Sequence, residues 1–239
     1  IIFYSGEFGA EYQYRDRYTL PTEEVASAVL DLEIQHRWGN PEPALEIYIS
    51  NTFEGLLGSS GLLDRETVRQ MYEAGMPGWE KVEFDDQLKQ DLWVPLTLDL
   101  KEKGYLDQFS IAFHWNPPKG GVDENGKIIP TRFDTYWLRG DLSIAFYDKN
   151  FPATDMTLNS LIDVTVMMSD ELDPYYVNEG NGSIRTNTSG QDLNFAGGNL
   201  YDPENPNDGH IKHYDCEGWV VTAPQSINKV ENDKAVVIK

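Results

Sequence analysis

The chain has 239 residues, with 19 lysines and arginines against 40 aspartates and glutamates, so its formal net charge is −21. This charge argues against nucleic acid and anionic lipid as partners, because both need a dense positive patch. No stretch approaches eighteen consecutive apolar residues, so the sequence predicts no membrane-spanning segment. Hydrophobic residues make up 40% and aromatic residues 12%, which is typical of a globular chain rather than a disordered one.

Most of the first 150 residues alternate between apolar and polar positions with a period of two, which predicts β-strands. The alternating segments lie at 28–36, 45–50, 93–100, 109–115 and 136–146. Turn-forming residues separate them at 39–41, 116–118 and 123–126. Strands do not alternate with helices, which excludes Rossmann-type and barrel enzymes. The sequence therefore predicts an all-β fold, a jelly-roll-type antiparallel β-sandwich.

One short helix is predicted at 65–74, inside a long excursion between two strands. Asp64 is placed to cap its start, and Gly75 follows its last turn. Val68, Met71 and Tyr72 fall on one face at helical spacing, which indicates that this face packs on the sandwich.

The residue composition of the sequence changes after residue 151. Apolar runs continue to 168, and the segment 169–215 is rich in Asp, Asn, Gly and Pro. We expect a sandwich at 20–150, a loop-rich extension at 151–215 that packs on it, and a terminal β element made of 1–19 and 216–239. We also expect residues 1–18 and 217–239 to contact each other more than they contact 90–115.

The single cysteine, Cys216, excludes an intrachain disulfide. Secreted eukaryotic domains of this size usually contain several, so we expect the cytosol or a bacterial envelope. Both ends are strand-like, without a start methionine, a signal peptide or a lipobox, which indicates the ordered part of a longer protein.

Metal and catalytic motifs are sparse. A turn-rich loop offers hard oxygen ligands suited to structural calcium, namely Asp202, Glu204, Asn207 and Asp208. A solvated loop would have the same composition, and the pair His210 and His213 leaves zinc as a weaker alternative. No Gly-x-Ser-x-Gly elbow is present, so we predict no hydrolase triad, no catalytic residue and no required cofactor.

Aromatic residues that fall on the polar sides of strands give the strongest indication of a binding site. Sugar rings stack on flat aromatic faces, and charged or amide groups bind their hydroxyls. On this basis we predict five ligand-binding residues: Tyr48, Trp93, His114, Trp137 and Arg139. We expect Trp137, Arg139 and His114 to share one face. The alternative is that residues 151–215 cover this face and turn its aromatics into a second small core.

Several segments resemble a known family. The stretch 45–55 resembles choice-of-anchor-J jelly-roll domains, as do 79–82 and 109–115. It contains a strand followed by Ser50, a turn, Phe53, an acid and Gly55. The stretches 3–7, 14–17 and 218–224 resemble the opening and the return of a Bacteroidetes surface lipoprotein family of unknown function that carries this jelly roll. In that family the opening belongs to an immunoglobulin-like segment. The resemblance covers 151–215 poorly.

The resemblance implies an exported protein on the outer face of the outer membrane, held by a lipid anchor outside this chain. Together with the aromatic residues, it leads us to predict a non-catalytic, monomeric cell-surface binding protein that captures glycans. Two alternatives stay open: a surface glycoside hydrolase, and an adhesion or scaffolding module of an outer-membrane complex. Forty acidic residues guarantee some pair at a hydrolytic spacing, so the sequence alone selects none.

Overall fold

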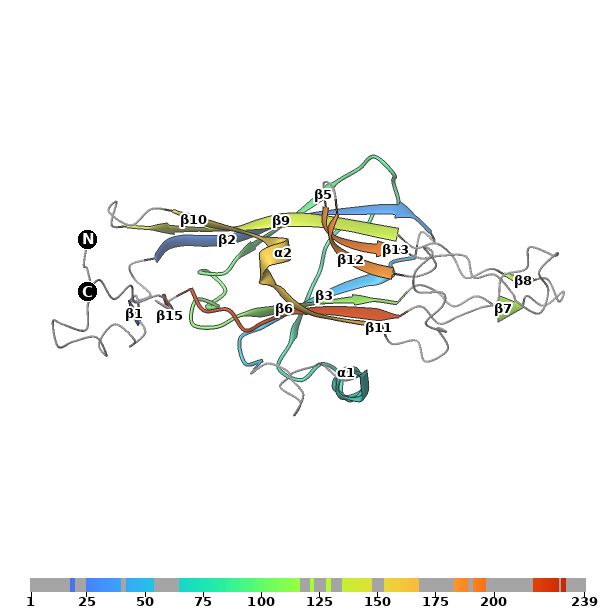
Figure 1. Ribbon diagram of the computed structural model, residues 1–239, viewed down its shortest axis with the longest axis horizontal. Coiled ribbons are helices and arrows are strands. Elements are labelled where there is room, and N and C mark those ends of the chain that lie inside the picture. Colours follow the sequence, from blue (N-terminus) through green and yellow to red (C-terminus); the bar gives the residue numbers. More distant parts are fainter. Residues whose placement is uncertain are drawn as a thin grey trace, which may run out of the picture.

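The protein is an all-β sandwich of two antiparallel sheets (Figure 1). The computed structural model describes residues 18–19, 25–39, 42–53, 65–116, 121–122, 128–129, 135–147, 153–167, 183–188, 191–196, 217–227 and 229–230. The predicted fold class is confirmed. Of the helices in these ranges, none has the length and continuous apolar run needed to cross a bilayer.

The first sheet has the strand order β12-β13-β9-β2-β5, with β10 paired to β9. Its strands are β2 (Val25–Trp38), β5 (Val94–Asp99), β9 (Thr135–Phe146), β10 (Thr154–Thr157), β12 (Ser183–Thr188) and β13 (Gln191–Ala196). The second sheet has the order β11-β14-β6-β3-β4. Its strands are β3 (Leu45–Ser50), β4 (Glu80–Val82), β6 (Ser110–Trp115), β11 (Ile162–Met167) and β14 (Gly218–Thr222). The chain passes repeatedly from one sheet to the other, as jelly-roll-type sandwiches do.

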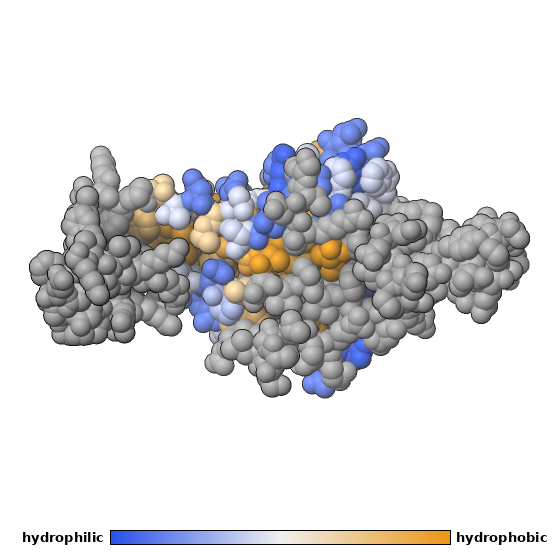
Figure 2. Space-filling view, viewed as in Figure 1, coloured by the Kyte–Doolittle hydropathy of each residue, from blue (hydrophilic) through white to orange (hydrophobic). Residues whose placement is uncertain are grey.

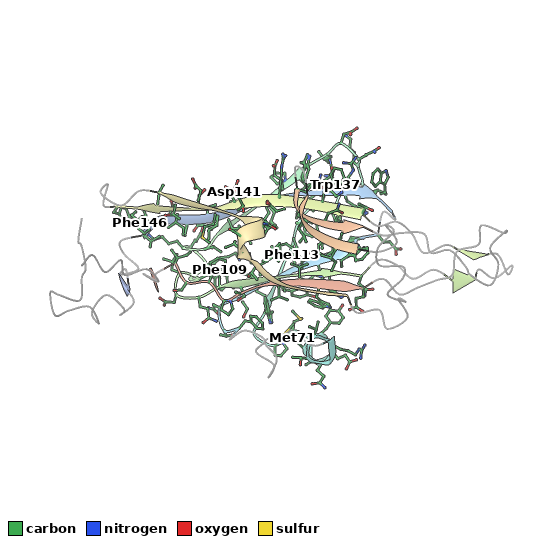
Figure 3. The ribbon with its side chains drawn as sticks, in the orientation of Figure 1. Met71, Phe109, Phe113, Trp137, Asp141 and Phe146 are labelled. Carbon is green, nitrogen blue, oxygen red and sulfur yellow. The ribbon has the colours of Figure 1, made fainter. Side chains whose placement is uncertain are left out.

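The core lies between the two sheets because alternate residues of each strand point inward. Leu30, Leu32 and Ile34 of β2 are at most 1% exposed, and Phe113 and Trp115 of β6 are fully buried. In Figure 3 the side chains of Phe109 and Phe113 lie between the sheets, whereas Trp137 and Asp141 point away from the core. Figure 2 shows the same division, with apolar residues in a band between the sheets and hydrophilic residues above β9 and β5.

Helix α1 (Arg65–Glu73) lies on the outer side of the second sheet, as Figure 1 shows. Its end is fixed by two backbone hydrogen bonds, from the Gly75 N–H to the Tyr72 carbonyl at 2.9 Å and from the Met76 N–H to the Met71 carbonyl at 3.0 Å. This pairing is the Schellman arrangement, which needs a left-handed residue that glycine supplies, and Gly75 has a φ of 79°. The predicted helix and its stop are confirmed; Asp64 lies outside the described residues.

A second helix, α2 (Leu158–Leu161), was not predicted. The Thr157 hydroxyl accepts a hydrogen bond from the Ser160 N–H and caps its start. Leu158 and Leu161 enter the core between the sheets. The apolar run that contains them therefore forms a short turn of helix between β10 and β11 rather than one continuous strand.

The structure differs from the expected domain division. The described residues of 151–215 include β10, β12 and β13 in the first sheet and β11 in the second, so they extend the sandwich instead of packing on it. Strand β14 lies between β11 and β6, inside the second sheet. The chain is thus not divided at 150 or at 216 within the part that the structure describes.

The two ends of the described chain meet in a short ladder. Strand β1 (Tyr18–Thr19) pairs with β15 (Lys229–Val230). Strand β14, however, pairs with β6 from Gly218 to Val221, so the expectation that 217–239 favours the N-terminal end over 90–115 is wrong for this strand. The remaining pair is β7 (Gly121–Val122) with β8 (Ile128–Ile129), and most of the expected terminal β element lies outside the described residues.

Candidate functional site

The outer face of the second sheet carries a row of polar and aromatic side chains across four neighbouring strands. The strand register creates this row: Tyr48 pairs with Lys81 of β4, Glu46 pairs with His114 of β6, and His114 pairs with Trp219 of β14. Residues directly opposite on one sheet face, and those two positions along, lie within side-chain reach. Helix α1 covers part of this face, where Val68, Met71 and Met76 join an apolar cluster with Tyr48 and Trp219.

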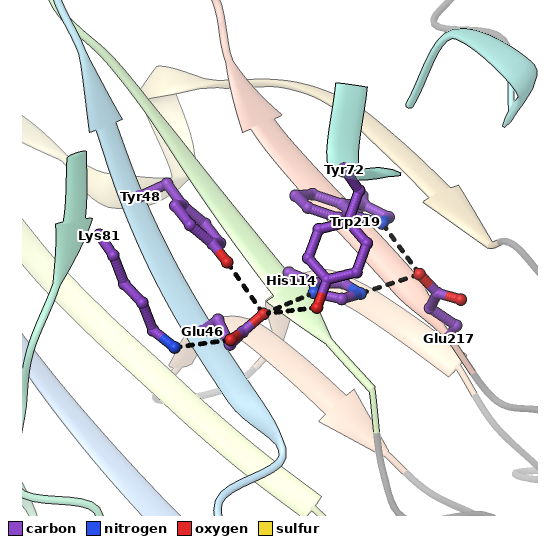
Figure 4. Close-up of polar contacts among 7 residues, drawn as sticks. All are labelled: Glu46, Tyr48, Tyr72, Lys81, His114, Glu217 and Trp219. Atoms are coloured by element: carbon purple, nitrogen blue, oxygen red, sulfur yellow. Dashed lines mark hydrogen bonds and ion pairs between the residues drawn. The ribbon is translucent and has the colours of Figure 1, made fainter. Parts of the chain in front are cut away.

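His114 is at the centre of the row and its side chain is fully buried. Its Nδ1 donates to Oε2 of Glu46 at 3.0 Å, and its Nε2 donates to Oε1 of Glu217 at 2.8 Å (Figure 4). Ionised carboxylates only accept hydrogen bonds, so this geometry favours protons on both ring nitrogens, which is the imidazolium form of His114. Burial lowers the pKa of His114, but the hydrogen bonds to Glu217 and Glu46 outweigh it, and the pKa of His114 is raised above 6.5.

Aromatic rings enclose this imidazolium. The indole of Trp219 stacks on it with ring centroids 4.0 Å apart and planes 12° apart, and the Tyr72 ring lies at 4.5 Å. A cation over an aromatic face is attracted by the ring quadrupole, more strongly where water is excluded. The Trp219 Nε1–H also donates to Glu217 Oε1 at 3.3 Å. His114 is therefore fixed in position by two carboxylates and two rings.

Glu46 links this cluster to the surface. Its Oε2 accepts hydrogen bonds from His114, from the Tyr48 hydroxyl at 3.0 Å and from the Tyr72 hydroxyl at 3.3 Å. Its Oε1 accepts one from Lys81 Nζ at 2.6 Å. The hydrogen bond from His114 is the largest cause that lowers the pKa of Glu46 to about 2. Burial, together with the Glu46 charge, raises the pKa of Tyr48 and of Tyr72.

A pocket of about 380 Å³ opens beside Glu46. This volume is within the range of small-molecule sites in proteins, near its lower end. Its lining residues come from β3 and the segment before it, from α1, from β4, and from the segments that follow β4 and β6: Pro43, Ala44, Leu45, Glu46, Tyr72, Lys81, Val82, Glu83, Phe84, Asp86 and Asn116. Asp86 is itself held in place, because it accepts hydrogen bonds from His36 Nδ1 at 2.9 Å and from the Tyr136 hydroxyl at 2.6 Å.

The structure does not bring the five predicted ligand-binding residues together. Tyr48 and His114 lie on the outer face of the second sheet, where they are 7% and 0% exposed. Both hold the Glu46 carboxylate through hydrogen bonds. Trp93, Trp137 and Arg139 lie on the outer face of the first sheet, on the opposite side of the sandwich. The expectation that His114 shares a face with Trp137 and Arg139 is therefore wrong. Period-two alternation separates inside from outside, but it does not tell which of two outer faces a strand contributes to.

Sequence reasoning missed five members of this site: Glu46, Tyr72, Lys81, Glu217 and Trp219. For Glu46 a signal was available, because it shares the polar side of its strand with Tyr48. For Tyr72 the helical face was recognised, but not the partner of its hydroxyl. Nothing near Glu217 in the sequence indicates that it lies beside His114.

The outer face of the first sheet holds two pairs of arginine and tryptophan. The guanidinium of Arg139 lies 4.3 Å from the Trp93 ring centroid, and that of Arg37 lies 3.5 Å from the Trp137 centroid. Arg139 is exposed, and both tryptophans are half-buried. The described strands of 151–215 continue the sheets edge to edge, so among them we find no second core over these aromatics.

The predicted calcium ligands Asp202, Glu204, Asn207 and Asp208 lie outside the described residues, as do His210 and His213. Among the residues that are described, no group of three or more His, Cys, Asp or Glu side chains is arranged to hold a metal ion.

The chain matches no known protein family, no curated protein and no solved structure at a significant level. The sandwich defines the fold class, and any functional argument depends on the chemistry of the two outer faces.

Proposed function

We propose that the protein is a non-catalytic carbohydrate-binding protein and that a neutral sugar occupies the pocket beside Glu46. The observation that carries this proposal is the ion pair between Glu46 and Lys81 on the pocket wall, with its atoms 2.6 Å apart. A carboxylate that accepts and an ammonium that donates, side by side, match a sugar hydroxyl, which both donates and accepts hydrogen bonds.

This ion pair keeps hydrogen-bonding capacity that a sugar hydroxyl can use. Glu46 Oε2 already accepts three hydrogen bonds, whereas Oε1 accepts one, from Lys81. Lys81 is half-exposed, and its ammonium has three N–H groups. Tyr72 and Phe84 add aromatic surface to the lining, on which the C–H face of a sugar ring can pack.

The pocket also needs little reorganisation to receive a ligand. His114, Tyr48 and Tyr72 hold the Glu46 carboxylate in one orientation, and Asp86 is held by His36 and Tyr136. Side chains that are already ordered lose less conformational entropy on binding, which favours affinity.

The glycosidase alternative receives less support from this site. A glycosidase needs one carboxylic acid that stays protonated near neutral pH to serve as the general acid. Glu46 has its pKa lowered to about 2, so it is ionised near neutral pH and does not provide that acid. Attachment to the outer membrane through a lipid anchor stays a prediction from the family resemblance, and an adhesion or scaffolding role stays an alternative function.

The test is isothermal titration calorimetry against neutral xylo-, cello-, malto- and manno-oligosaccharides, with product analysis after prolonged incubation. We expect one series to bind, and K81M to weaken it by about tenfold, as the loss of a hydrogen bond to a charged group predicts. K103M is the matched control, because Lys103 pairs with Glu80 at 2.9 Å outside the pocket. Sugar cleavage would favour the glycosidase, and the absence of binding to every series would refute the proposal.

A further inference from the structure

A β-bulge near the end of β2 brings two consecutive residues to the outer face of the first sheet. In the ladder with β9, His36 pairs with Tyr136 and Trp38 pairs with Thr135, so Arg37 is an extra residue without a partner in the register. Regular alternation would place Trp38 on the core side, like His36 two positions before it. The bulge instead places Trp38 on the same side as Trp137, and it is 45% exposed. Bulges often redirect side chains in this way at functional sites.

Arg37 lies over both indoles. Its guanidinium carbon is 3.5 Å from the Trp137 ring centroid and 4.7 Å from the Trp38 centroid. Its Nη1 donates a long hydrogen bond of 3.4 Å to Oε1 of Gln35, which is buried with 3% exposure. The stacking fixes the plane of the guanidinium, so the fork of N–H donors has a defined direction.

The charge of Arg37 has no carboxylate partner among the described residues, in a chain whose acids outnumber its bases by 40 to 19. The other arginine of this face shows the contrast. Arg139 stacks on Trp93 in the same manner, but its Nε donates to Glu33 Oε2 at 2.5 Å, directly across the strand pair. Among the described residues of this face, Arg37 is therefore a cation that is held in a fixed orientation but forms no ion pair with a carboxylate.

We propose that Trp38, Arg37 and Trp137 form a second binding site, which takes a single uronic acid unit within an otherwise neutral oligosaccharide. A guanidinium binds a carboxylate through two parallel hydrogen bonds, which a point charge cannot reproduce. The exposed Trp38 indole provides a flat apolar surface for the sugar ring that bears the carboxylate. The chemistry of the site thus combines one bidentate anion contact with one stacking contact.

The surrounding charges restrict the ligand to isolated carboxylates. Asp31 and Asp141 lie directly opposite each other on this face and are both exposed, and the whole chain carries −21. A continuous polyanion would be repelled by these charges, whereas one carboxylate between neutral sugars meets only Arg37. The site is distinct from the pocket beside Glu46, because Trp38, Arg37 and Trp137 are not among the residues that line that pocket.

The test uses calorimetry with xylotriose that bears one glucuronic acid, with its carboxyl-reduced analogue and with an end-capped tripeptide that carries a single glutamate. We expect the acidic sugar to bind about tenfold or more tightly than either of the other two, as the loss of a charge-assisted contact predicts. R37K and R37Q should each remove this preference, since lysine retains the charge but not the fork. W38A should weaken the acidic sugar and its reduced analogue together, because it removes the stacking surface that both sugars share, whereas Arg37 keeps its contact with Trp137.

R139Q is the matched control, because Arg139 stacks on a tryptophan but is already neutralised; its affinity for the acidic sugar should stay within about threefold of the wild type. In K81M, which tests the pocket, the preference for the acidic over the reduced sugar should be unchanged. Equal binding of the acidic and reduced sugars, or an R37Q protein with the same unfolding midpoint and undiminished preference, would overturn the inference. Equal binding of the glutamate tripeptide would also overturn it, because the site would then recognise a carboxylate without a sugar.

Discussion

Replacing His114 by leucine should destabilise the protein by about 3 kcal/mol near pH 6. The substitution removes two hydrogen bonds between an imidazolium and carboxylates, at 3.0 and 2.8 Å. Such bonds contribute about 1.5–3 kcal/mol each. We take the lower end for each, because Glu46 and Glu217 retain 27% and 29% exposure, so water partly replaces the lost donors. H114Q, which keeps one amide donor, should lose about half as much.

The pH dependence gives a sharper test than the magnitude. The folded-state pKa of His114 is raised, so its contribution is complete below about pH 6.5 and is lost as pH rises through the folded-state value. The pKa of Glu46 is lowered from 4.5 to about 2, so its contribution is present above about pH 4.5 and is lost as pH falls towards 2. The cluster should therefore stabilise the fold most between these two limits.

The assay is urea unfolding of the wild type and H114L at about pH 5.5, 7 and 9, followed by near-ultraviolet circular dichroism. The difference in unfolding free energy between the two proteins should shrink from pH 5.5 to 9. A difference that stays constant or grows over this range would refute the assignment of a charged His114 between two carboxylates. A loss below about 1 kcal/mol at pH 5.5 would show that the cluster does not stabilise the fold.

Three further predictions concern the scaffold. G140A should lower the unfolding free energy by about 1–3 kcal/mol in a urea titration, because a Cβ there would lie 2.5 Å from the Asp31 carbonyl oxygen; an unchanged midpoint would contradict this close approach. V68A should cost about 2 kcal/mol by the same measurement, since Val68 lies on the inner face of α1 and is fully buried against the sheet, and wild-type stability would show that α1 is not docked. Added calcium should raise the melting temperature and a chelator should lower it if the loop at 202–208 binds this ion; indifference to both would count against the predicted ligands.

The sequence predicted α1 and five of the strands, β2, β3, β5, β6 and β9, because their signals are local. Alternation within six to ten residues identifies a strand, and Gly75 marks a helix end whichever surface the helix packs on. The second sheet was harder, since β14 enters between β11 and β6 after a long segment without clear periodicity. No local pattern specifies which strands become neighbours.

The site was mostly beyond sequence reasoning for the same reason. His114 contacts carboxylates that lie 68 and 103 residues away in the sequence, and only the strand register brings them together. The bulge at Arg37 is equally invisible, because alternation assigns Trp38 to the core. Trp93, Trp137 and Arg139 were placed correctly on a polar face by their period-two positions.

The short connection from α1 to β4 links the pocket to the folding of the helix. Tyr72 of α1 and Lys81 of β4 both line the pocket. Between them, the Ser50 hydroxyl at the end of β3 donates to the Gly78 carbonyl at 2.6 Å and ties the connection to the sheet. A helix of nine residues is not stable in water by itself, so α1 persists only while its apolar face stays packed on the sheet.

If α1 undocks for a fraction of the time, the pocket is complete for only the remaining fraction, and the apparent affinity for a sugar falls in proportion. A substitution such as V68A, which touches no ligand, would then weaken binding by shifting this local equilibrium. Conversely, a bound sugar that contacts both Tyr72 and Lys81 would slow hydrogen exchange along α1 while leaving the amides of β9 unchanged. Occupancy of the pocket and local folding of the helix would then be a single coupled event.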